Sequence, residues 1–397
     1  MASSPFHKRP IALAPLNGVR VLACTGITLF HVALLFVAAG SAWHWYDILD
    51  RHKWANLACG AAFMFAMTTF MILTGLLAAS RIIPGLEQGQ DQWRKVIWSY
   101  YARRIWRILP AYYVALAINA CAWSWPAAWS SPSPEAEALQ DYFKMGNSRA
   151  AWTLPLLISN ITLDMRSFIF CWNIPVQLQF YLLLPLIGLL LQPQSPSFRR
   201  RIAWTCVLAA VVATLYRIVI VMAFSIQAQL PIGAHSHAAS HHPSSVVAAW
   251  GFLDWLYSAF ISRMTDLALG ILIYIIIASP RACAAIRSRP WVCTIVSALV
   301  SAFVVSTCLA DSDIRPRPEE VAPLSARLGV QVVAFGVVVP VTLAWLVLYV
   351  LVQPGWPARR AAEILGSPKT LYHKNYSPYT THTVNTSKPP VTEIRGA

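Results

Sequence analysis

The stretch LNGVRVLACTGITLFH, Leu16 to His31, begins the first apolar run of this chain that can cross a bilayer. A helix needs about 20 apolar residues to span the hydrocarbon core. The run over 17–39 has this length, yet it contains one arginine and one histidine. Because ionisable groups are costly in lipid, they indicate that one face of this helix borders a polar cavity.

The composition places the whole chain in a membrane. Of its 397 residues, 57% are hydrophobic and 12% are charged, whereas a soluble domain has roughly 25% charged residues. The net charge of +15 would favour nucleic acid if the basic residues formed one patch, but they form short clusters between apolar runs. This arrangement is typical of an integral, multi-pass membrane protein, and it excludes nucleic acid as the expected partner.

Eight apolar runs predict eight spans, over 17–39, 57–79, 108–125, 174–192, 202–224, 260–279, 291–310 and 329–352. Lysine and arginine are abundant at the N-terminus and in every second loop, as expected of cytosolic segments. We therefore predict an all-α, polytopic transmembrane helix bundle of about eight spans, with both termini cytosolic. The membrane domain covers 1–352, and 353–397 is predicted to be a polar, disordered tail.

The ionisable residues of the first run share one helical face. Arg20 and His31 are eleven residues apart, which is about three turns and about 16 Å along the axis. This places Arg20 at the cytosolic end and His31 near mid-membrane, where a titratable group favours a functional site. The structural alternative is a neutral His31 that hydrogen-bonds a neighbouring helix, with Arg20 extended to the interface.

Two further clusters stand at the starts of the third and fourth predicted spans. YYARRIWRILPAYY contains Arg103, Arg104 and Arg107 within one helical turn of each other. They are either an ordinary cytosolic anchor or a clamp for a polyphosphate such as coenzyme A, because guanidinium groups bind phosphate bidentately. In CWNIPVQLQFYLLLPL, Gln177 and Tyr181 lie on one face.

Taken in order, these segments resemble the acyltransferase-3 family of integral membrane acyltransferases. The first-span arginine and histidine, RRIWRILPAYY and WNIPVQLQFYLLLP resemble three of its motifs. FMILTGLL, with Thr74-Gly75, resembles its second-span motif, and RMTDLALGILI (Arg263 to Ile273) a looser fifth one. The resemblance covers residues 14–352.

The resemblance implies an O-acyltransferase in the plasma membrane or an internal membrane. It would move an acyl group other than aminoacyl, often acetyl, from cytosolic acyl-CoA to a hydroxyl of a sugar, lipid or other acceptor. His31 would be the essential histidine, since histidine is the usual base at neutral pH, and Arg20 its partner. Whether His31 deprotonates the acceptor or carries the acyl group stays open. The implied binding residues are Arg103, Arg104 and Arg107 for the CoA phosphates, and Gln177 and Tyr181 for orienting substrate.

No metal cofactor is expected. The sequence HSHAASHH contributes four histidines, His235, His237, His241 and His242, which is a composition that can bind zinc. No carboxylate or cysteine lies near them in the sequence. A flexible polar loop is therefore the preferred interpretation.

Two departures from the family pattern keep other functions open. Gln177 and Asn17 stand where the family has glutamate and aspartate, and an amide cannot act as a base. After the eighth run, YSPYTTH (Tyr376 to His382) resembles a late family motif, but no run there can span a bilayer. Either two helices are lost or an altered reading of the gene produced the last residues. The alternatives are an inactive, truncated relative with an interaction role, and a transporter, although no internal repeat favours the latter.

Overall fold

The computed structural model describes residues 14–36, 65–123, 151–162, 172–224, 256, 259–291, 294–299, 302, 333, 336–353 and 357–365. Side chains from Phe30 to Phe36 are outside this description. The predicted all-α class is confirmed. The elements are α1 (Ala14–Phe36), α4 (Met67–Glu87), α5 (Gln90–Trp123), the 3-10 turn η5 (Ala151–Thr153), α7 (Asn173–Leu190), α8 (Phe198–Phe224), α11 (Phe260–Ile277), α12 (Pro280–Arg287), α15 (Val339–Val352) and α16 (Pro357–Leu365).

Four of these helices are long and apolar enough to cross a membrane. They are Met67–Glu87, Asn173–Leu190, Phe198–Ala223 and Phe260–Ile277, and the shorter Gly336–Val352 is also apolar. They correspond to the second, fourth, fifth, sixth and eighth predicted spans. Most of the seventh, together with the histidine-rich loop, lies outside the described residues. The count of eight and the cytosolic placement of both termini remain predictions.

The helix α5 begins well before the predicted span over 108–125. It starts at Gln90 and has 34 residues, which is about 51 Å. Residues 90–107 mix basic and aromatic side chains, so hydropathy misses them, but they contain neither proline nor glycine to end a helix. The arginines of RRIWR therefore lie near the middle of a helix, not at its entrance.

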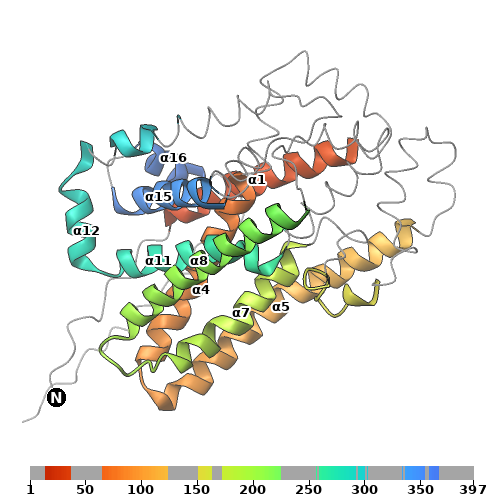
Figure 1. Cartoon of the computed structure of the whole chain (residues 1–397), viewed down its shortest axis with the longest axis horizontal. Coiled ribbons are helices and arrows are strands. Elements are labelled where there is room, and N and C mark those ends of the chain that lie inside the picture. Colours follow the sequence, from red (N-terminus) through yellow and green to blue (C-terminus); the bar gives the residue numbers. More distant parts are fainter. Residues whose placement is uncertain are drawn as a thin grey trace, which may run out of the picture.

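The helices α4 and α11 form the centre of the bundle (Figure 1). Their backbones touch at two glycines. A Cβ on Gly75 would meet the Leu267 carbonyl, and a Cβ on Gly270 would meet the Ile72 carbonyl. Small residues permit such close approach between membrane helices. The α5–α7 pair lies on one side of this centre, and α1, α15 and α16 lie on the other (Figure 1).

Several helix ends meet at one end of the bundle. Arg199, at the start of α8, forms a bidentate ion pair with Glu87, at the end of α4, with both N–O distances 2.7 Å. Arg287 of α12 donates to the carbonyl of Val352, the last residue of α15. These contacts attach the end of α4 to the start of α8, and α12 to the end of α15.

The short helix α16 lies inside the segment predicted as a tail. Pro357 occupies its first turn, where proline is favourable. Arg359 pairs with Glu363 one turn later at 2.8 Å, which supports the helix. The ordered chain therefore extends past residue 352, and 366–397 lies outside the described residues.

Candidate functional site

The guanidinium of Arg104 lies between two tyrosine rings near the middle of α5. Its Cζ is 4.6 Å from the ring centroid of Tyr181, on α7, and 5.6 Å from that of Tyr100, one turn earlier on α5. The two rings pack edge to face, with centroids 6.0 Å apart. Cation–π contacts at these distances are attractive, so the side chain of Arg104 is held in one orientation.

Four helices contribute to this site. The guanidinium of Arg20, from α1, is partly buried and interacts electrostatically with Arg104, Arg107 and Tyr181. The Tyr181 hydroxyl also interacts with Thr74 of α4. We call Arg20, Arg104 and Arg107 the arginine cluster. The residues that the sequence singles out on α1, α5 and α7 thus meet in space.

The arginine cluster has an excess of positive charge. Within the described ranges, none of its three arginines forms an ion pair with a carboxylate. Tyr181 is 4% exposed and lies midway along the 18 residues of α7, which is a candidate span. Arg104 is therefore level with the middle of a spanning helix, deeper than the predicted entrance. Cations at such a depth are characteristic of functional sites.

Two predicted site residues are not placed in the arginine cluster. Arg103 is exposed and donates to Ser99 Oγ of its own helix at 3.2 Å, on a different face from Arg104. His31 lies on α1, three turns beyond Arg20, and its side chain is outside the described residues. Of the residues between them, Thr28 is exposed and donates to the Cys24 carbonyl at 2.9 Å.

Gln177 and Gln179 lie on different faces of α7 and have different surroundings. Gln177 is 7% exposed, one turn before Tyr181, and its amide makes no hydrogen bond to another residue that the structure describes. Gln179 exchanges two hydrogen bonds of 2.8 Å with Asn160 and donates to the Leu157 carbonyl. It thereby attaches the segment 151–162 to α7, and Tyr112 of α5 adds a bond of 2.8 Å to the Leu154 carbonyl.

This contrast predicts that two matched substitutions differ in their effect on stability. Gln179→Leu leaves the buried Asn160 amide without its partner, and should lower the free energy of unfolding by about 1–3 kcal/mol. Gln177→Leu keeps the volume and breaks no bond seen here, so we expect little change in stability. Thermal unfolding of both variants in detergent measures this difference. Equal melting temperatures for the two variants would contradict the described role of Gln179.

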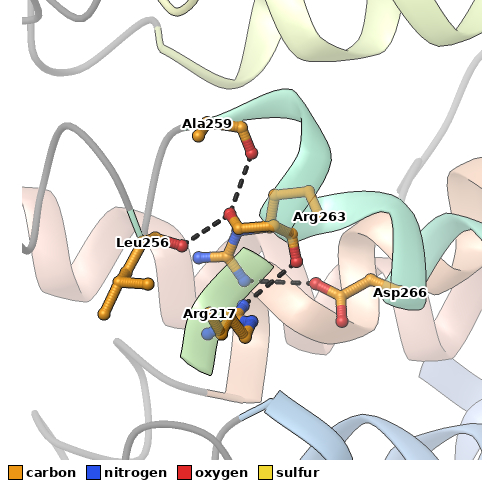
Figure 2. Close-up of polar contacts among 6 residues, drawn as sticks. Arg217, Leu256, Ala259, Arg263 and Asp266 are labelled. Carbon is orange, nitrogen blue, oxygen red and sulfur yellow. Dashed lines mark hydrogen bonds and ion pairs between the residues drawn. The ribbon is translucent and has the colours of Figure 1, made fainter. Parts of the chain in front are cut away.

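A second charged cluster ties α11 to α8 (Figure 2) and also to α7. Arg263 Nη1 lies 3.1 Å from Asp266 Oδ2, and their side chains are 6% and 1% exposed. The Arg263 guanidinium also lies 5.2 Å from the ring centroid of Trp172, at the start of α7. Arg217 of α8 donates to the Ser262 carbonyl at 3.1 Å. This second cluster joins α7, α8 and α11 at a position away from the end of the bundle where Glu87 pairs with Arg199.

Sequence reasoning identified only part of this second cluster. Arg263 and Asp266 stand in a segment that resembles a family motif, but no role was predicted for them. Arg217 was not singled out, because hydropathy averages a single arginine into the apolar run 202–224. The available signal was its position, since an arginine well inside a spanning segment indicates a specific partner.

Comparison with known protein families matches residues 13–367 to a family model described as an acyltransferase domain. No match is found among curated proteins or among solved structures.

Proposed function

Since that match covers most of the chain, the protein belongs to the acyltransferase 3 family of integral, multi-pass membrane acyltransferases, and we propose that it transfers an acyl group from cytosolic acyl-CoA to a hydroxyl-bearing acceptor. The observation that supports this donor is the arginine cluster. Three guanidinium groups gathered beside a spanning helix repel one another unless an anion lies between them. The phosphates of coenzyme A supply that charge and accept bidentate hydrogen bonds.

The proposed roles of the residues follow from their positions. Arg20, Arg104 and Arg107 bind the phosphates, and the rings of Tyr100 and Tyr181 fix Arg104 in place. A donor held there directs its pantetheine arm, with the thioester at the far end, along α1 toward His31. The family resemblance included Arg103 among the phosphate ligands. Arg103 is bonded to Ser99 of its own helix, whereas Arg107 acts on Arg20 and Tyr181, and this difference argues against a contribution from Arg103.

His31 carries the chemistry in this proposal. As a base it takes the proton of the acceptor hydroxyl while that oxygen attacks the thioester carbonyl, and it then returns the proton to the leaving CoA thiolate. As a nucleophile it first accepts the acyl group and releases CoA, and the hydroxyl then attacks the acyl-histidine. Gln177 and Tyr181 orient the acceptor by hydrogen bonding, a role that an amide can fill although it cannot act as a base.

A matched pair of arginine variants tests the donor site. Arg104→Ala should weaken binding of acetyl-CoA to the purified protein in nanodiscs about 10-fold to 100-fold, because charge-assisted bonds contribute about 1.5–3 kcal/mol each. Arg103→Ala removes the same charge one residue away and should bind acetyl-CoA like the parent protein. Arg104→Lys should be intermediate, since lysine keeps the charge but not the planar fork. Equal affinities for the two alanine variants would exclude this site.

One observation favours a second candidate function. Gln177 stands where the family has glutamate, so an inactive relative with an interaction role would also bind CoA through the arginine cluster. Membranes incubated with radiolabelled acetyl-CoA separate the two. Label in an acceptor supports the enzyme, and CoA binding without transfer to any acceptor supports the inactive relative.

A further inference from the structure

An apolar crevice of about 110 Å³ lies between α7 and α8, with α4 and α11 behind it. Its walls are almost entirely aliphatic and aromatic side chains, among them Leu86, Phe180, Ile202 and Leu267. The space exists because α8 packs along α11 rather than along α7. Gly188 also lines it, and a Cβ at this position would meet the Leu86 side chain, so α4 packs closely against α7 here.

The crevice opens toward the bilayer. Leu183 lines it and is 40% exposed. The neighbouring surface of α7 continues with Leu182, Leu186 and Leu190, which are 51%, 52% and 81% exposed. In a spanning helix this leucine-rich surface faces lipid. An apolar space does not hold ordered water, so hydrocarbon is the matching occupant.

One end of the crevice adjoins the arginine cluster. Phe180 lines the crevice, and its ring centroid is 5.9 Å from that of Tyr181. Arg104 is held against that same Tyr181 ring. A chain lying in the crevice therefore has its polar end close to the residues proposed to bind and orient substrate.

We propose that this crevice binds the hydrocarbon chain of the acceptor, so that the acceptor is a lipid carrying a hydroxyl group rather than a soluble sugar. The inference rests on the proposed function. The donor is bound through its phosphates and enters from water. A molecule that enters through an opening toward the bilayer already resides in the bilayer, which assigns the crevice to the acceptor.

Photolabelling of the full chain in nanodiscs tests the proposal without requiring turnover. The probe is a long-chain alcohol with a diazirine in its chain, and labelled peptides are identified by mass spectrometry. We expect labelling of α7 and α8 that the unlabelled alcohol competes away. The exposed Trp98 and Trp106 on α5, which are 74% and 80% exposed, should be labelled without saturation, as bulk lipid contacts are.

Two variants of α8 provide the control. Ala209 lines the crevice, whereas Ala210 does not. Ala209→Phe should fill the space and reduce saturable labelling about 10-fold, with Ala210→Phe unchanged. Comparable melting temperatures for the two variants establish that both are folded.

The outcomes separate this proposal from the proposed function. Saturable labelling that disappears in Ala209→Phe supports an acceptor chain even if no acyl transfer is detected. Absence of saturable labelling in the parent protein, or the same loss in both variants, overturns the proposal. It is also overturned if a photoreactive palmitoyl-CoA labels the crevice and the alcohol does not, because the chain would then belong to the donor.

Discussion

Replacing His31 with alanine is expected to lower acyl transfer about 10²-fold to 10⁴-fold, the range that a positioned acid–base group contributes. No other titratable group is proposed to move the hydroxyl proton, so residual transfer would reflect positioning of the two substrates alone. Binding of acetyl-CoA should persist, because the phosphates are held by the arginine cluster some three turns away. Transfer of radiolabelled acetyl to membrane lipids and binding to the purified protein measure the two effects.

A nearby residue of α1 serves as the control for His31. Thr28 is exposed and its hydroxyl is bonded within its own helix, so Thr28→Ala should retain transfer. Incubation with labelled acetyl-CoA in the absence of acceptor distinguishes the two routes. Label on the parent protein but not on His31→Ala indicates an acyl-histidine, and label on neither indicates a base. Unchanged transfer in His31→Ala would remove His31 from the mechanism.

The second large effect concerns stability. Asp266→Ala leaves the buried guanidinium of Arg263 without its carboxylate, and breaking one partner of a buried pair costs about 3–5 kcal/mol. The exposed pair of Arg359 and Glu363 is the matched control, because Glu363 is 43% exposed and such pairs contribute only about 0.2–1 kcal/mol. Thermal and denaturant unfolding in detergent should therefore show a large loss for Asp266→Ala and a small one for Glu363→Ala.

A double variant shows whether the loss arises from the uncompensated charge. Arg263→Met combined with Asp266→Leu removes both charges of the pair and should be more stable than Asp266→Ala alone. Asp266→Ala leaves two buried guanidinium groups, Arg263 and Arg217, that repel each other, whereas the double variant leaves only Arg217. The stabilising role of the Arg263–Asp266 pair is wrong if Asp266→Ala and Glu363→Ala have the same melting temperature. It is also wrong if the double variant is less stable than Asp266→Ala.

The sequence correctly predicted those helices whose apolar runs are bounded by polar residues. The predicted spans 174–192, 202–224 and 260–279 correspond closely to α7, α8 and α11. Their apolar runs are bounded by residues such as Asn173, Arg201 and Ser279. The start of α5 could not be predicted in this way, because hydropathy reports solvation by lipid and not helix formation. Its first half mixes basic residues with tryptophans yet is fully helical.

The candidate site was predicted as a set of residues but not as an arrangement. Arg20, Arg104, Arg107 and Tyr181 were chosen from separate segments, and the structure brings them together. The depth of these residues depends on the axial register of α5 against α7. The exclusion of Arg103 depends on which face of α5 meets α7. Neither is encoded in a local pattern. His31 was placed by periodicity, and its role stays a prediction.

The contact at Gly75 and Gly270 has a mechanical consequence. Because the backbones of α4 and α11 touch there, with no side chain between them to yield, these two helices can neither slide nor rotate against each other without steric overlap. Any opening that admits or releases a substrate must then be a movement of the outer helices relative to the fixed pair of α4 and α11. Thr74, directly before Gly75, and Asp266, about one turn before Gly270, belong to this fixed pair of helices.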